Sequence, residues 1–104
     1  MNRALQEVPG LDGVACSNDL IALGALFECQ RQGIAVPGDV AVVGFGDLDF
    51  SASCIPSLTT IRPSGDLIGK EVARLILGSI HGERPGDAAR IIDTGHVLVE
   101  RRST

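Results

Sequence analysis

The sequence predicts an α/β fold, with a mainly parallel sheet flanked by helices, from three observations. Short apolar runs that suit strands alternate with longer segments of helical periodicity. Residues 40–45, with sequence VAVVGF, show no polar alternation, which is typical of a parallel strand covered on both faces. Only three of the 104 residues are aromatic, so Val, Ile, Leu and Ala must build the core, as in α/β layer proteins.

A strand and a helix are predicted in the first third of the chain. Residues 14–16 (VAC) suit a short strand, and the helix can begin at Ser17 or Asn18, because both residue types are good N-caps. The helix is expected to end at Gly33, since Gly followed by an apolar residue and a nearby Pro is a common C-terminal pattern. Residues 1–8 are expected to be the tail of an earlier helix.

Further strands and a second long helix are predicted after the strand at 40–45. A short strand is expected at residues 58–61, and then a helix from Pro63 to about His81 whose apolar residues fall on one face. Residues 90–93 and 97–99 are β-rich runs separated by a Gly-containing turn, so we expect a pair of strands there. A sheet of so few strands has open edges, and the chain is therefore expected to be part of a domain.

The composition argues against several classes of function. A formal net charge of −4 and few aromatic residues disfavour contact with nucleic acid through this segment. The three cysteines are an odd number without a CxxC spacing, which favours reduced thiols in a cytoplasmic protein over a disulfide framework or a zinc site. No apolar stretch approaches the roughly 20 residues that span a bilayer. We therefore expect no metal, no cofactor and no membrane contact.

Polar residues follow two of the predicted strands, at the place where ligands bind in open α/β sheets. Asn18 and Asp19 come after the first strand at a helix N-terminus, whose free N–H groups favour oxygen-rich or anionic partners. Gly46 and Asp47 follow the strand at 40–45, where glycine allows close approach and a carboxylate accepts hydrogen bonds from hydroxyls. The sequence predicts a ligand-binding edge, with helix capping and a solvated loop as the structural alternatives.

The acidic loop also permits a catalytic interpretation. Asp47 and Asp49 form a pair of acids of the kind used in acid–base catalysis or Mg²⁺ binding. No nucleophile and base accompany them in the loop, so we expect the chain not to be an enzyme. A purely structural dimerisation unit without a ligand is the third interpretation that the sequence leaves open.

The first long helix is more apolar than one core-facing stripe requires. Residues 20–27 contain five large apolar side chains in about two turns, so a second surface must cover some of them. That surface belongs either to a larger domain or to a second subunit. The predicted interface residues lie in this helix and in an apolar part of the loop that follows the strand at 40–45: Leu23, Leu26, Phe27, Cys54 and Ile55.

Four stretches follow one another in an order that resembles the C-terminal part of LacI-family transcriptional repressors: CSNDLIALGAL, GIAVPGDVAVVGFGDLD, PSLTTIRPSGDLIGKEVARLIL and the closing RRST. The likeness covers residues 13–104. It implies a partial subdomain of the type I periplasmic-binding-protein-like fold. In that fold two α/β subdomains close around a small molecule, usually a sugar, and homodimerise. Residues 1–104 are then the C-terminal portion of this domain, without the family's DNA-binding domain and N-terminal subdomain, so no operator contact is expected from this segment.

The resemblance also implies roles for single residues. Asn18 occupies a family position that commonly hydrogen-bonds the effector, and Phe45 occupies the aromatic position of the family's GYDD motif. This chain has GFGD there, so the first acid of the motif is absent and Asp47 keeps the second. The GFGD variant is similar to gluconate-operon repressors, which implies a sugar acid, because loss of a carboxylate removes repulsion toward an anion. The implied ligand-binding residues are Asn18, Asp19, Phe45 and Asp47.

Overall fold

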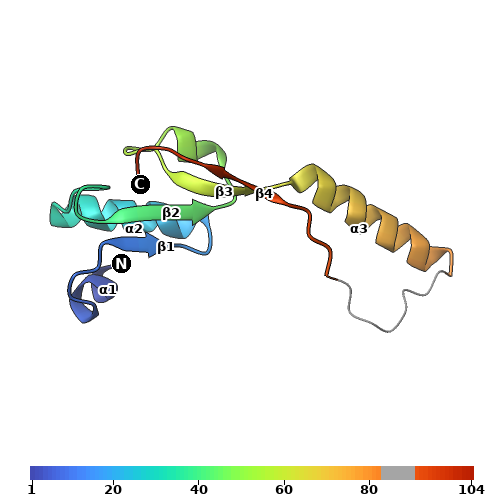
Figure 1. The fold of residues 1–104 in the computed structure, drawn as a ribbon, viewed down its shortest axis with the longest axis horizontal. Helices are drawn as coiled ribbons and strands as arrows, with labels where there is room; N and C mark the ends of the chain where they lie inside the picture. Colours follow the sequence, from blue (N-terminus) through green and yellow to red (C-terminus); the bar gives the residue numbers. More distant parts are fainter. Residues whose placement is uncertain (83–90) are drawn as a thin grey trace. The chain divides into compact units, whose positions relative to one another are not determined.

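The computed structural model describes residues 1–82 and 91–104, which form two compact units (Figure 1). The first unit contains Met1–Arg62 and Leu98–Thr104, and the second contains Pro63–Val97. Every residue predicted to bind a ligand or a second subunit lies in the first unit. The first unit therefore carries the candidate site.

The described strands β1 (Gly13–Ala15), β2 (Ala41–Phe45), β3 (Thr59–Pro63) and β4 (His96–Val99) form one sheet in that order, and the first three strands are parallel. In the register of these strands Val14 lies beside Val42, and Gly44 lies beside Thr60. This arrangement confirms the predicted α/β class with a mainly parallel sheet. The elements are α1 (Asn2–Glu7), β1 (Gly13–Ala15), α2 (Asp19–Gln32), β2 (Ala41–Phe45), the 3₁₀ helix η1 (Asp49–Ala52), β3 (Thr59–Pro63), α3 (Gly65–Ile80) and β4 (His96–Val99).

Helix α2 begins and ends where its capping residues require. The Oδ1 atom of Asn18 accepts a hydrogen bond from the backbone N–H of Ile21 at 2.9 Å, and Gly33 closes the helix in the left-handed conformation with φ 70°. One face of α2 packs against β2 and the start of β3. The buried side chains of this core are Ala22, Ala25, Leu26, Val40, Val42 and Leu58.

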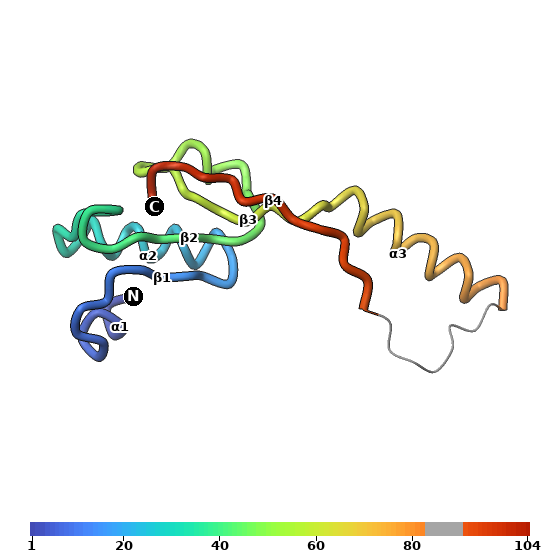
Figure 2. The backbone as a smooth tube through the Cα atoms, viewed as in Figure 1, coloured from blue at the N-terminus to red at the C-terminus, as the bar shows by residue number. Residues whose placement is uncertain are grey.

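The C-terminal residues run back beside β3 and link β2 to β3 (Figure 2). The backbone carbonyl of Ser103 accepts a hydrogen bond from the N–H of Val42 at 2.8 Å. The hydroxyl of Ser103 donates to the carbonyl of Val42 at 2.6 Å and accepts from the N–H of Thr59 at 2.8 Å. Ser103 is fully buried, so these bonds satisfy backbone groups at the start of both strands that water does not reach.

The second unit consists mainly of α3, which forms as predicted but has no buried residue among those described. Its apolar side chains are between 37% and 71% exposed: Leu67, Ile68, Val72, Leu75, Ile76, Leu77 and Ile80. No helix in the described part of the chain is long and apolar enough to cross a membrane.

The strand pair predicted near the C-terminus is only half correct. Residues 97–99 belong to β4, but residues 91–95 form no helix or strand, and Arg90 lies outside the described residues. Gly95 has a φ of 73°, and the side chain of Asp93 accepts a hydrogen bond from the Gly95 N–H at 2.8 Å. The residues around Gly95 nevertheless form no turn between two strands, because no strand precedes them, so the predicted strand pair was wrong.

Candidate functional site

The candidate site lies at the carboxyl ends of β1, β2 and β3, which meet at one edge because the strands are parallel. The first segment is the start of α2, with Asn18 and Asp19. The second is the loop from Gly46 to Leu48, and the third is the end of β3 at Thr60 and Arg62. Hydrogen bonds join all three segments, so the edge is a connected polar structure.

The carboxylate of Asp19 lies at the centre of this edge and is fully buried. Its Oδ1 atom accepts from the hydroxyl of Thr60 at 2.6 Å, and its Oδ2 atom accepts from the hydroxyl of Ser51 at 2.7 Å and the N–H of Leu48 at 2.8 Å. Burial alone would raise the pKa of the Asp19 carboxyl, but these hydrogen bonds outweigh it and hold the pKa below its usual value.

Gly44 makes room for the Asp19 carboxylate. A Cβ atom at residue 44 would lie 2.2 Å from Oδ1 of Asp19 and 3.1 Å from the side chain of Leu58. Real carbon and oxygen atoms do not approach so closely, so any side chain at residue 44 would displace the Asp19 carboxylate. The glycine in the VGFG run therefore has a steric function inside the fold, below the surface of the candidate site.

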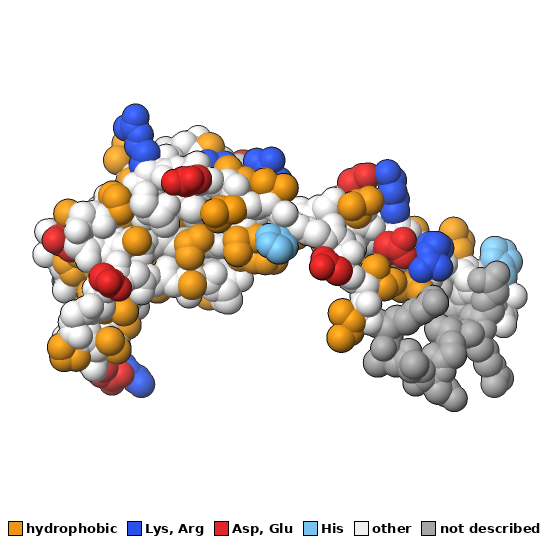
Figure 3. Space-filling model, in the orientation of Figure 1, with side chains coloured by type: hydrophobic (Ala, Val, Ile, Leu, Met, Phe, Trp, Pro, Cys, Tyr) orange, Lys and Arg blue, Asp and Glu red, His pale blue; other side chains and the backbone are white. Residues whose placement is uncertain are grey.

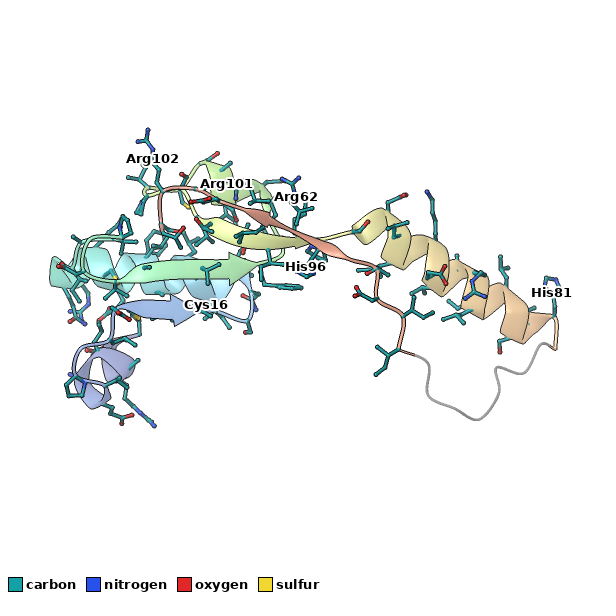
Figure 4. All side chains as sticks on the ribbon, viewed as in Figure 1. Cys16, Arg62, His81, His96, Arg101 and Arg102 are labelled. Atoms are coloured by element: carbon teal, nitrogen blue, oxygen red, sulfur yellow. The ribbon has the colours of Figure 1, made fainter. Side chains whose placement is uncertain are left out.

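The carboxylate of Asp47 is held by two arginines. Its Oδ1 atom lies 2.7 Å from Nη2 of Arg101, and its Oδ2 atom accepts from Nε and Nη2 of Arg62 at 2.5 Å. Figure 4 labels the two arginines, Arg62 and Arg101. The hydrogen bond from Arg101 and then that from Arg62 lower the pKa of the Asp47 carboxyl, against the effect of burial. Arg101 also donates from Nη1 to the carbonyl of Leu58 at 2.8 Å and is only 16% exposed, so it belongs to the interior of the edge.

The four predicted ligand-binding residues lie at this edge in different environments. Asn18 is exposed, and its Oδ1 caps α2 while its amide nitrogen has no partner among the residues described. Phe45 is 44% exposed at the end of β2. Direct ligand contact by Asp19 does not fit the structure, because its carboxylate is buried and takes three protein hydrogen bonds. Asp47 is 10% exposed and ion-paired, so it positions the arginines and is not a free acceptor.

Two further residues, Arg62 and Arg101, complete the edge and were not among the predicted site residues. Arg62 stands next to the strand residues 58–61, and the rule that ligands bind at strand ends applies to it as well as to Asp47. Arg101 carries no such signal, since it is 54 residues from Asp47 in the sequence. No observation supports the catalytic alternative. Asp49 is exposed in η1. In residues 1–82 and 91–104, no cluster of three His, Cys, Asp or Glu side chains could hold a metal.

The predicted interface residues separate into a surface group and a core residue. Phe27 is 59% exposed, Ile55 is 81% exposed, and Leu23 and Cys54 are half-buried. The interface prediction is wrong for Leu26, which is 1% exposed and packs in the core. Hydrophobic side chains are visible on the surface of the first unit (Figure 3).

Four exposed or half-buried apolar residues form what we call the apolar stripe: Leu20, Leu23, Phe27 and Ile55. Leu20 is 64% exposed and, with Leu23 and Phe27, occupies one face of α2 at spacings of three and four residues. The side chain of Gln30, three residues after Phe27, donates to the carbonyl of Ile55 at 2.6 Å. This bond holds the loop that carries Ile55 against the same face of α2.

Comparisons with known proteins match the whole chain. Residues 1–104 match the model of the periplasmic binding protein-like domain. The chain is 41% identical over 100 residues to the HTH-type transcriptional regulator GntR of Pseudomonas aeruginosa, a match that covers 96% of this chain and 29% of that protein. The curated relatives are much longer, and the matches span 24% to 31% of their length.

Solved structures of transcriptional regulators have the same fold. A complex of the transcriptional regulator CelR with cellobiose is 33% identical, with a TM-score of 0.87 over 99% of this chain and 31% of that chain. The lac repressor dimer bound to operator and an anti-inducer is 29% identical, with a TM-score of 0.80 over 98% of this chain and 35% of that chain. The arrangement of helices and strands in this chain is thus that of part of a regulator's effector domain.

Replacing Gly44 with alanine is expected to destabilise the fold by about 1–3 kcal/mol, because the new methyl group would displace the Asp19 carboxylate or Leu58. The measurement is the free energy of unfolding in urea. Gly24→Ala is the matched control: Gly24 is a helical glycine with no atom within 4 Å of its added Cβ, so this variant should be stabilised by up to about 1 kcal/mol. Equal effects at both positions would contradict the steric role of Gly44.

Acidification is expected to lower the free energy of unfolding, because protonation of Asp47 removes its ion pairs with Arg62 and Arg101. Because its pKa is lower in the folded chain, this carboxylate stabilises the fold above its unfolded pKa of about 3.9, and that contribution is lost as the pH falls through the folded pKa. Urea unfolding between pH 7 and pH 2 should show a smaller loss of stability for Asp47→Asn than for the unaltered chain. Asp49→Asn, which removes an exposed carboxylate without a described partner, should retain the full loss.

Proposed function

Because the chain belongs to the periplasmic binding protein-like domain family, and within it to the LacI-type regulators, we propose that it forms one wall of an effector-binding cleft and a homodimer contact. The effector is a small polyhydroxylated molecule, a sugar or a sugar acid. The observation that carries this proposal is the convergence of Asn18, the loop at Gly46 and Arg62 at one edge of three parallel strands.

The chemistry of the exposed groups suits a sugar. The amide nitrogen of Asn18 is a hydrogen-bond donor at the surface of the edge, and the N–H groups of Arg62 are further donors. Phe45 adds an exposed ring of the kind that covers the apolar face of a sugar. The similar regulator CelR is described in complex with the sugar cellobiose, which supports the same class of ligand for this fold.

The dimer proposal rests on the apolar stripe. Leu20, Phe27 and Ile55 expose between 59% and 81% of their surface on one continuous face, which is more than solvent exposure of single apolar residues explains. A two-fold axis would place the stripe of one subunit against the same stripe of its partner. The lac repressor, a structural relative, is described as a dimer, and this supports the assignment.

In a regulator of this type, ligand and operator affect each other through a change in population between two arrangements of the dimer. We propose that residues 1–104 supply the C-terminal part of the effector domain to such a protein and act in the cytoplasm, where operators are bound. Operator contact is assigned to other parts of the regulator, since this segment carries a net charge of −4. No catalytic step is assigned to the chain.

Ligand binding is expected to raise the melting temperature of the 104-residue chain. The test is a thermal melt at rising concentrations of D-gluconate, gluconate 6-phosphate, D-ribose and D-galactose, since a ligand that binds only the folded state stabilises it by RT ln(1 + L/Kd), which rises with the ligand concentration L. Asn18→Asp keeps an oxygen that caps α2 but removes the amide donor, so it should reduce the shift without loss of the helix. The absence of a shift with every compound would contradict the proposed ligand site.

Dimerisation is expected to depend on Phe27. Phe27→Asp places a charge in the apolar stripe, so sedimentation equilibrium should show a dimer for the unaltered chain and a monomer for this variant. Val8→Asp changes another exposed apolar residue, at the end of α1, and should leave the dimer intact. A persistent dimer in Phe27→Asp, or a monomeric unaltered chain, would rule out the stripe as the subunit contact.

A further inference from the structure

We propose that Arg62 determines the charge of the ligand, and that its guanidinium binds the carboxylate or phosphate group of an anionic sugar at the candidate site. This inference rests on the proposed function and adds the class of ligand and the residue that selects it. Its support is the geometry around Asp47 and the charges that remain exposed at the edge.

The backbone at Arg62 is fixed beside the loop that follows β2. Ile61, the preceding residue, pairs with Phe45, and its carbonyl accepts a hydrogen bond from the N–H of Gly46 at 2.8 Å. The side chain of Arg62 then turns to Asp47 and contacts Oδ2 with both Nε and Nη2. An arginine held at two nitrogens has lost much of its rotamer freedom before any ligand arrives, so further binding costs less entropy.

Asp47 does not need Arg62 for its own neutralisation. Arg101 already contacts the other oxygen of Asp47 at 2.7 Å and is 16% exposed, which makes it the interior partner of this carboxylate. Arg62 is the second positive charge on the same carboxylate and is 54% exposed. With the buried Asp19 counted, the two acids and the two arginines of this edge balance, and Arg62 is by far the most exposed of the four charged groups.

The other acids near this edge leave Arg62 as the charge that faces solvent. Asp19 is fully buried, and its charge is stabilised by the hydroxyls of Thr60 and Ser51 and the N–H of Leu48. Gly46 has φ 124°, a conformation that L side chains rarely adopt, so the position before Asp47 carries no acid. Asp49 is exposed in η1 and forms no ion pair with Arg62 among the described contacts.

An oxyanion is the ligand group that these features fit. Guanidinium binds carboxylate and phosphate through paired, charge-assisted hydrogen bonds, and Nη1 of Arg62 has no partner among the described residues. The N-terminus of α2, a helix of 14 residues, contributes a favourable dipole at the same edge. A sugar acid and a sugar phosphate share this oxyanion chemistry, and both carry the hydroxyl groups that Asn18 is proposed to bind.

The test compares ligands of equal length and different charge. Thermal melts of the 104-residue chain are measured with D-gluconate and with D-glucitol, which has a neutral group in place of the carboxylate, and with gluconate 6-phosphate and inorganic phosphate. We expect gluconate to act at a concentration at least about tenfold below that of glucitol, as loss of a charged hydrogen-bonding partner implies. A shift by gluconate 6-phosphate alone assigns the phosphate, and a shift by gluconate assigns the carboxylate.

Two variants connect this preference to Arg62. Arg62→Gln should bring the affinity for gluconate down to that for glucitol while leaving the glucitol shift unchanged, and Arg62→Lys should give an intermediate preference because it keeps the charge without the planar fork. Arg102→Gln, which removes another exposed arginine, should retain the full preference. If Arg62→Gln melts without ligand at a lower temperature, each shift is measured from the ligand-free melting temperature of the same variant, and the intermediate preference expected of Arg62→Lys still tests the role of Arg62.

The outcomes separate this inference from the proposed function. Equal shifts with glucitol and gluconate would overturn the role of Arg62 and leave the sugar site in place. A gluconate preference that persists in Arg62→Gln would also overturn it. If inorganic phosphate shifted the melting temperature as much as gluconate and gluconate 6-phosphate do, the edge would bind anions without being a sugar site. If no compound shifted the melting temperature, both proposals would be wrong.

Discussion

The first unit depends on the carboxylate of Asp19 more than on any other polar group. It joins the start of α2 to the loop after β2 and to β3 through three hydrogen bonds, each worth about 1.5–3 kcal/mol when one partner is charged. A buried carboxylate without these donors would be too costly to keep ionised. The close packing at Gly44 exists because the carboxylate needs that space, and the position of the edge follows from both.

The hydrogen bonds and ion pairs within the protein determine which groups at the edge remain available to a ligand. Asp19 takes neutral donors from the interior, and Asp47 takes two arginines, so neither carboxylate remains as a free acceptor. The groups left at the surface are donors, the amide of Asn18 and the guanidinium of Arg62. Hydroxyl oxygens and oxyanions are the natural partners of such a set, whereas cations are not. Acidic residues in the sequence thus produce a surface that favours an electron-rich ligand.

Local signals explain which parts of this structure the sequence could predict. The cap at Asn18, the glycine at 33 and the apolar run of β2 act within a few residues, and the bounds of the predicted helices and parallel strands agree with the structure to within two residues. The pairing of Asp47 with Arg62 and Arg101 joins residues 15 and 54 positions apart, so no local pattern announces it. Leu26 was misassigned because α2 is apolar on two faces, and a helical period cannot say which face is covered by its own sheet.

Helix α2 connects the two surfaces on which the proposals rest. Its N-terminal residues belong to the ligand edge, its core face packs on β2, and its third face carries most of the apolar stripe. Asn18 and Phe27 are nine residues apart, about 14 Å along a helix with a rise of about 1.5 Å per residue. Because α2 is one continuous helix packed against the sheet, we propose that it links occupancy of the edge to the contact between subunits in the proposed dimer.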